Sequence, residues 1–141
     1  TKKAINQLQL FVNQYPYSSY TDSCYVLIGK LNYKLEQKAY AIAKQYFHME
    51  LYKSAIVAFD NFINDYPSSS LLEDAFFNLL KARYMLLVNS VDSKKSERAS
   101  QLTETYVRFM DYFPDSRYLK EAEAIYEKAL KEKEKIQGQK I

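Results

Sequence analysis

The chain has 141 residues, of which 48% are hydrophobic, with only 2 glycines and 3 prolines. This length and composition fit one all-helical domain and leave few residues for glycine-rich turns. The net charge of +3 comes from 20 basic and 17 acidic side chains that are interspersed, which argues against a nucleic-acid-binding protein. No apolar run approaches the ~18 residues of a membrane-spanning helix, and the N-terminus has no signal-peptide pattern.

The motif Phe-x4-Pro-x-Ser occurs three times, starting at Phe11, Phe62 and Phe109, and an aromatic residue directly precedes each proline. An apolar stripe with helical spacing leads into every proline. Proline ends a helix because it cannot donate the backbone hydrogen bond and disfavours α geometry in its predecessor, and the serine two residues later can cap the next helix. The sequence therefore predicts a repeat protein built from helices that stop at proline.

Six helices are expected, at about residues 2–14, 19–48, 52–64, 70–89, 96–112 and 117–135. The second is unusually long because an apolar residue recurs every seven positions and no proline interrupts it, at Ile28, Leu35, Ile42 and Met49. It would serve as the last helix of one repeat and the first of the next. The first helix has no partner helix before it, so we expect the chain to be the C-terminal piece of a longer protein.

The middle of the chain has the spacing of a tetratricopeptide repeat, in which small residues let two helices approach and aromatic residues fill the gaps. The residues concerned are Ala39, Ala43, Tyr46, Ala55, Phe59 and Pro67. The prolines at 16, 67 and 114 lie farther apart than the standard period of about 34 residues. The long helix takes up the first surplus, and the polar stretch 89–96, expected to be a loop, takes up the second. We predict an all-α, tetratricopeptide-like helical-repeat solenoid, with a single domain over 1–141 and a C-terminal capping helix.

The chain offers little for catalysis. Cys24 is the only cysteine, which excludes an internal disulfide and a Cys-x2-Cys metal cluster, and its register predicts a small buried packing residue. His48 is the only histidine and is expected to be solvated at a helix end. No phosphate-binding glycine loop or nucleophile motif is present. We therefore predict no catalytic, cofactor or metal site, and a protein that is not an enzyme.

Tyrosine is abundant, with 14 Tyr and 8 Phe against 0 Trp. Most of the aromatic residues lie on the apolar stripes, but Tyr33, Tyr40, Tyr52 and Tyr84 are less well placed for a core. Exposed tyrosines beside basic residues suit a protein-binding surface. The partner-binding candidates are Tyr40, Lys44, Arg83, Lys94, Lys95 and Arg98. For each of them the alternative is a half-buried tyrosine or a charge that only solvates its helix.

Several segments resemble the BamD family, the outer-membrane assembly lipoproteins of the β-barrel assembly (BAM) machinery. They are YPYSSYTD at 15–22, LEQKAY at 35–40, AKQYF at 43–47 and DYPS at 65–68, and the stretch 89–98 looks like the Bacteroides-type version. The resemblance spans nearly the whole chain and matches the C-terminal half of that family.

The resemblance implies a non-catalytic scaffold on the periplasmic face of the outer membrane. In the family, the C-terminal half docks the periplasmic domains of the barrel-assembly subunit and, in some lineages, accessory lipoproteins. Membrane attachment would be through an N-terminal lipid anchor that this chain lacks. Two alternatives stay open: another periplasmic tetratricopeptide-repeat adaptor, of the coordinator type associated with the Tol-Pal system, and an enzyme subunit with a helical-repeat domain.

Overall fold

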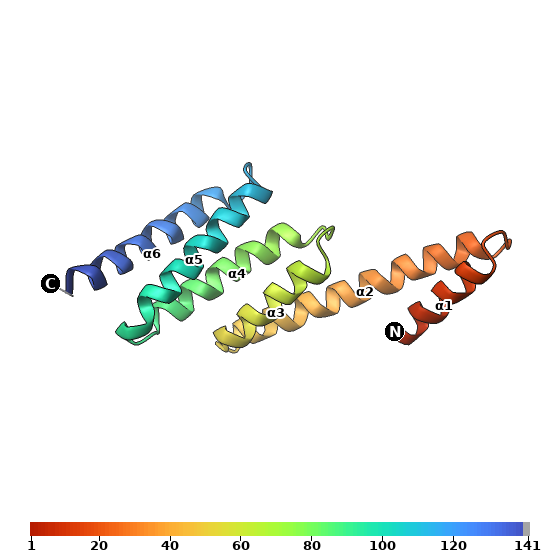
Figure 1. Ribbon diagram of the computed structural model, residues 1–141, viewed down its shortest axis with the longest axis horizontal. Coiled ribbons are helices and arrows are strands. Elements are labelled where there is room, and N and C mark those ends of the chain that lie inside the picture. Colours follow the sequence, from red (N-terminus) through yellow and green to blue (C-terminus); the bar gives the residue numbers. More distant parts are fainter. Residues whose placement is uncertain (140–141) are drawn as a thin grey trace. The chain divides into compact units, whose positions relative to one another are not determined.

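The computed structural model describes residues 1–139, which form six α-helices joined by short turns (Figure 1). The helices are α1 (Lys2–Gln14), α2 (Thr21–His48), α3 (Tyr52–Asp65), α4 (Leu72–Val88), α5 (Asp92–Tyr112) and α6 (Leu119–Gln139). The predicted all-α, helical-repeat fold class is confirmed. α6, for which the sequence predicts a capping role, continues four residues beyond its predicted end.

The chain divides into two compact units, unit 1 from Thr1 to Ala39 and unit 2 from Tyr40 onward. In unit 2, α3 packs on α4, α4 on α5 and α5 on α6, and α4 also contacts α6. In unit 1, an apolar groove runs between α1 and the first part of α2, where Cys24 contributes to the lining. Cys24 is half-buried there, not fully buried as its register predicted, because the groove is open. The single domain expected from the sequence stays a prediction.

The long helix α2 is unbroken over its full length, as predicted. The seven-residue stripe that indicated it, however, does not stay on one buried face. Ile28 is buried, but Ile42 and Met49 are 44% and 56% exposed. A straight α-helix drifts by about 20° with each heptad, so residues seven apart leave a common face. The C-terminal part of α2 instead buries Ala43, and Tyr40 lies half-buried beside it.

The three Pro-x-Ser turns share one geometry. The residue before each proline has φ between −126° and −135° and ψ between 60° and 67°. The serine Oγ then accepts the amide N–H two residues on, from Tyr20 at 3.2 Å, Leu71 at 3.0 Å and Tyr118 at 3.1 Å. The next helix begins one residue after that amide. The serine therefore orders the turn ahead of the helix and is not itself the N-cap, which corrects the capping role predicted for it.

The core of unit 2 is apolar and rich in phenylalanine. Its fully buried large side chains are Phe59, Phe62, Phe76, Phe109, Leu79, Leu80, Leu87 and Leu102. The ring of Phe62 lies 5.7 Å from the ring of Tyr40 in α2. Small residues appear where α6 joins this core, since Ala122 and Ala129 are buried. Side chains with little volume let neighbouring helices approach closely.

The polar stretch 89–96 is mostly helix, which corrects the predicted loop. α5 begins at Asp92, four residues before its expected start, and only Asn89–Val91 connect it to α4. The negative charge of Asp92 in the first turn interacts favourably with the positive end of the helix dipole. Lys95, one turn later, forms an ion pair with Asp92 at 3.8 Å. The first turn of α5 is mostly exposed and contains few apolar residues. Apolar periodicity therefore could not indicate that this turn is helical.

Candidate interaction surfaces

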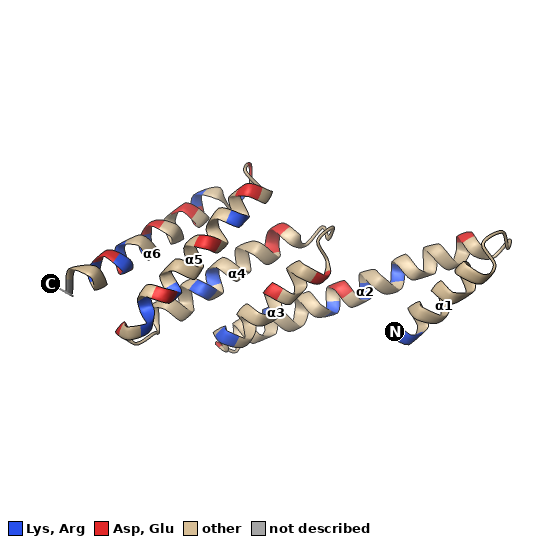
Figure 2. Ribbon diagram, viewed as in Figure 1, with Lys and Arg blue, Asp and Glu red and all other residues tan. Residues whose placement is uncertain are grey.

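Within residues 1–139, no group of three or more His, Cys, Asp or Glu side chains is placed to hold a metal ion. No helix among them is both long and apolar enough to cross a membrane. Acidic and basic residues both occur on α3, α4, α5 and α6 (Figure 2). Two grooves on the surface of unit 2 contain the predicted partner-binding residues Tyr40, Lys44, Arg83, Lys94 and Arg98. They lie on opposite sides of α4.

The first, which we call the basic groove, lies over α3, α4 and α5 and has a volume of about 350 Å³. Its lining residues are Lys53, Ile56, Val57, Arg83, Leu86, Lys94, Glu97, Arg98 and Gln101. Four of these side chains are basic and one is acidic. Three of the predicted partner-binding residues, Arg83, Lys94 and Arg98, meet here from two helices. Lys53 was not in the predicted set.

Arg83 lies within the basic groove with only 17% of its side chain exposed. Its Nη2 donates to Asp60 Oδ2 at 3.2 Å, while its Nε is buried without a hydrogen-bond partner among the described residues. Burial lowers the pKa of Arg83, although the carboxylate of Asp60 opposes this effect. The guanidinium group nevertheless stays charged at neutral pH, because an arginine has a very high intrinsic pKa. The basic groove thus holds a cation whose position is fixed and whose N–H donors are only partly hydrogen-bonded.

The other predicted residues of this region, Arg98, Lys94 and Lys95, have different surroundings. Arg98 Nη1 donates to the hydroxyl of Ser90, which in turn donates to the carbonyl of Leu86, so that Arg98 is anchored to the end of α4. Lys94 is exposed at the groove. Lys95 instead forms ion pairs with Asp92 at 3.8 Å and with Glu132 of α6 at 3.5 Å. Of the two adjacent lysines, only Lys94 lines the basic groove.

The second surface, which we call the aromatic groove, has a volume of about 410 Å³. Its lining residues are Tyr40, Lys44, Phe47, His48, Asp74, Phe77, Asn78, Lys81, Tyr118 and Glu121. The predicted residues Tyr40 and Lys44 belong here. Arg83 follows Asp74 by nine residues, about two and a half turns, and so faces the opposite side of α4. The six predicted residues therefore do not form one surface.

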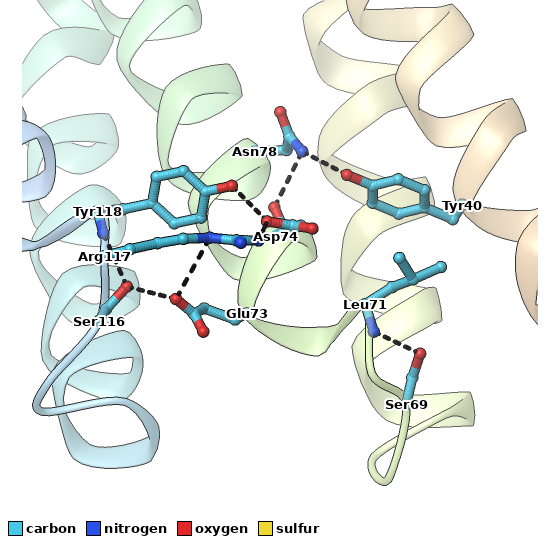
Figure 3. A network of polar contacts seen from close by, with 9 residues as sticks. All are labelled: Tyr40, Ser69, Leu71, Glu73, Asp74, Asn78, Ser116, Arg117 and Tyr118. Carbon is cyan, nitrogen blue, oxygen red and sulfur yellow. Dashed lines mark hydrogen bonds and ion pairs between the residues drawn. The ribbon is translucent and has the colours of Figure 1, made fainter.

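A polar network ties the turn before α6 to the first turns of α4 (Figure 3). Asp74 accepts hydrogen bonds from Arg117 Nη2, at 2.6 Å, and from the Tyr118 hydroxyl. Ser116 Oγ donates to Glu73 Oε1 at 3.0 Å. Because the Asp74 carboxylate is held from two sides, its charge is largely compensated within the network.

The network changes the acidity of its members. Burial by itself raises the pKa of Asp74, but the hydrogen bonds from Tyr118 and Arg117 outweigh it, and the pKa lies below its ordinary value. The hydrogen bond that Tyr118 donates to Asp74 raises the pKa of Tyr118. Burial, with a contribution from the Asp74 carboxylate, raises the pKa of Tyr40. All three shifts favour an ionised Asp74 beside neutral tyrosines near neutral pH.

Two lysines of the aromatic groove lie over aromatic rings. Lys81 Nζ is 5.0 Å from the ring centroid of Phe77 and 5.5 Å from that of Phe47. Lys44 Nζ is 5.5 Å from the ring centroid of Tyr40. Neither ammonium group forms an ion pair with a carboxylate of the described residues. Sequence reasoning missed Lys81, Asn78 and Tyr118, because only the fold brings these residues of α4 and of the turn before α6 into one groove with Tyr40.

The exposure of the singled-out side chains differs from case to case. Tyr33 is 49% exposed, whereas Tyr40, Tyr52 and Tyr84 are half-buried, the alternative considered for them. His48 is exposed at the last position of α2, as expected.

A protein-family model named YfiO, described as outer membrane lipoprotein, matches residues 1–98. The chain belongs to this family. No curated protein sequence matches it significantly. The match confirms the resemblance to BamD-type proteins and extends from α1 through α4 into the start of α5. Membership of the YfiO/BamD family implies a role as an outer-membrane assembly lipoprotein and association with the BAM complex, and the family is non-catalytic.

Proposed function

We propose that this YfiO/BamD-type chain is a docking scaffold on the periplasmic face of the outer membrane that binds the periplasmic domains of the barrel-assembly subunit. Family membership supports the general assembly role. The observation that carries the docking role is the basic groove, whose lining holds four cations and one carboxylate, that of Glu97, while Asp60 pairs with one of the cations, Arg83. Accessory outer-membrane lipoproteins are a second class of partner for the same scaffold.

The basic groove combines fixed and adaptable charges. Arg83 and Arg98 are held by Asp60 and Ser90, so their positions are set before a partner arrives. Lys53 and Lys94 are exposed and can adjust to an acidic surface. Complementary charges of this kind raise association rates and specificity, and their effect weakens as salt screens them. The partner domain is therefore expected to present carboxylates to this groove.

The test uses the purified periplasmic domains of the barrel-assembly subunit and the double reversal Lys53→Glu/Lys94→Glu, which changes only exposed side chains. Affinity should fall by about 10- to 100-fold, as for the loss of charge pairs worth about 1–3 kcal/mol, and should become less sensitive to salt. Arg83→Glu is a poor probe because it would place two carboxylates together at Asp60.

The matched control is Lys120→Glu/Lys131→Glu, which reverses the same number of charges at exposed positions of α6. This variant should bind as the parent does. Unchanged binding of the Lys53/Lys94 variant at both low and high salt would show that the basic groove is not the dock. An equal loss in both variants would show that only the net charge of the chain matters.

A further inference from the structure

We propose that the aromatic groove is a separate binding site for an extended peptide segment that carries acidic side chains. The site lies on the side of α4 away from the basic groove, so it does not depend on the docking proposed above. Three features of the groove support this inference: its two lysines, the hydrogen-bonding groups of Asn78 and Tyr40, and its rigid aromatic wall.

The lysines supply positive charge that the described residues leave without a carboxylate partner. Lys44 and Lys81 each lie over aromatic rings, and this contact restrains the ammonium groups near the groove before a ligand binds. Asp74 also lines the groove, but Arg117 and Tyr118 already occupy its carboxylate. Glu121 is exposed, and His48 is exposed at the end of α2. A ligand carboxylate therefore finds two restrained cations, on α2 and α4.

Asn78 and Tyr40 together offer a ligand one hydrogen-bond acceptor, the Asn78 amide oxygen, and one donor, the Tyr40 hydroxyl. Asn78 Nδ2 donates to the Tyr40 hydroxyl at 3.0 Å and to the carbonyl of Asp74 at 2.9 Å, which fixes the orientation of the amide. Its Oδ1 has no donor among the described residues, and the Tyr40 hydroxyl keeps its own hydrogen to donate. Every residue of an extended peptide presents one N–H and one C=O. This pair of groups matches that pattern, whereas a simple anion would use only the donors.

The groove has the size and rigidity of a binding site. Its volume of about 410 Å³ lies within the range of about 300–1,000 Å³ that is typical of ligand sites. One wall is the stack of Phe77 on Tyr118, with ring centroids 4.2 Å apart, and the hydrogen bond to Asp74 holds Tyr118 in place. A wall that is already ordered costs little conformational entropy when a peptide binds.

The test titrates the ¹⁵N-labelled full chain with two short synthetic peptides of glycine and serine, one bearing glutamates and the other glutamines at the same positions. We expect amide shifts confined to the residues around the groove, on α2, on α4 and at the start of α6. At low salt, the glutamate peptide should bind about 10-fold or more tightly than the glutamine peptide. Equal binding of the two peptides would overturn the acidic specificity, and no shifts at this groove would overturn the site.

Two variants and one control separate the contributions. Lys44→Met/Lys81→Met keeps the stems on the rings but removes the charges, so it should abolish the preference for glutamate. Asn78→Ala should weaken both peptides equally, because the amide faces the peptide backbone. The control, Lys53→Met/Lys94→Met in the basic groove, should bind both peptides as the parent does. If the control loses the preference as well, the attraction is due to net charge and the proposal fails, whatever the result with the barrel-assembly subunit.

Discussion

The ring of Tyr118 is stacked on the ring of Phe77, with the centroids 4.2 Å apart and the planes 10° apart. The Tyr118 hydroxyl also reaches Asp74, one turn before Phe77 on α4. A single residue ahead of α6 thus makes both an apolar and a charge-assisted contact with α4. Aromatic pairs are worth about 0.5–1.5 kcal/mol beyond their buried area, and a hydrogen bond to a charged group is worth about 1.5–3 kcal/mol. These contacts hold the start of α6 against α4.

Asp74 should make the stability of the fold depend on pH in the acid range. Because its pKa is lowered in the folded chain, its contribution is complete above the unfolded value of about 3.9 and is lost as the pH falls through the lower folded value. Asp74→Asn should therefore lower the free energy of unfolding by about 1 kcal/mol at pH near 6. Urea unfolding at several pH values should show this gap closing below pH ~4.

The exposed Asp111 provides the control for this experiment. Asp111→Asn should not lower the free energy of unfolding at any pH, since the structure gives this carboxylate no hydrogen bond or ion pair within residues 1–139 and it lies in the last turn of α5, where a negative charge opposes the helix dipole. A gap between parent and Asp74→Asn that stays constant down to pH 3 would contradict the role assigned to the network.

The three turn serines should differ in importance although their sequence motifs are alike. Ser18 and Ser69 each accept one amide hydrogen bond, whereas Ser116 also donates to Glu73 and is buried. Losing hydrogen bonds of these types costs about 0.5–3 kcal/mol, with bonds to charged groups at the upper end. Alanine at Ser116 should fall at the upper end of this range, and alanine at either of the other two at the lower end. Thermal melts of the three single variants would test the order, and an equal loss at all three sites would refute it.

The helices and their order could be predicted from sequence because proline and apolar spacing act locally. α1 has its predicted bounds, and α2 is continuous as expected. The start of α5 was missed because its first turn is polar and mostly exposed, so no apolar face marks it. Local patterns therefore gave the elements but not all of their ends.

The candidate surfaces could be predicted only in part. The sequence pointed to Tyr40 and Arg83 as members of one surface, yet their helices place them in different grooves. The position of a residue along its helix determines the direction in which its side chain points. Its neighbours, however, depend on helix packing, which sequence spacing does not encode. Lys94 and Lys95 make the same point: they are adjacent in sequence, but 100° apart around an ideal helix.

Lys95 should stabilise the packing of α5 on α6 and not serve as a docking residue. It pairs with Glu132 at 3.5 Å, and the two side chains are only 19% and 24% exposed. A double-mutant cycle with Lys95→Met and Glu132→Gln should give a coupling energy of about 0.5–1 kcal/mol in urea unfolding. Lys94→Met, next in sequence but without such a pair among the described residues, should leave stability unchanged. A coupling energy near zero would mean that the pair does not hold the two helices together.

The turn between α2 and α3 should be stabilised by glycine at position 50. Glu50 has φ of 61°, the left-handed conformation that favours glycine. Its N–H donates to the carbonyl of Phe47, and the N–H of Leu51 donates to the carbonyl of Tyr46, both at 3.0 Å, which is the Schellman arrangement at the end of α2.

Glu50→Gly would remove the cost of about 1–2 kcal/mol that a side chain pays in this conformation, while the more flexible unfolded chain takes back about 0.5–1 kcal/mol. The free energy of unfolding should therefore rise by about 0.5–1 kcal/mol, measured by urea denaturation. Lys53→Gly, three residues on in the first turn of α3, should lower it, because its backbone is helical. A loss of stability in Glu50→Gly would show that the glutamate side chain contributes more to this turn than its backbone conformation costs.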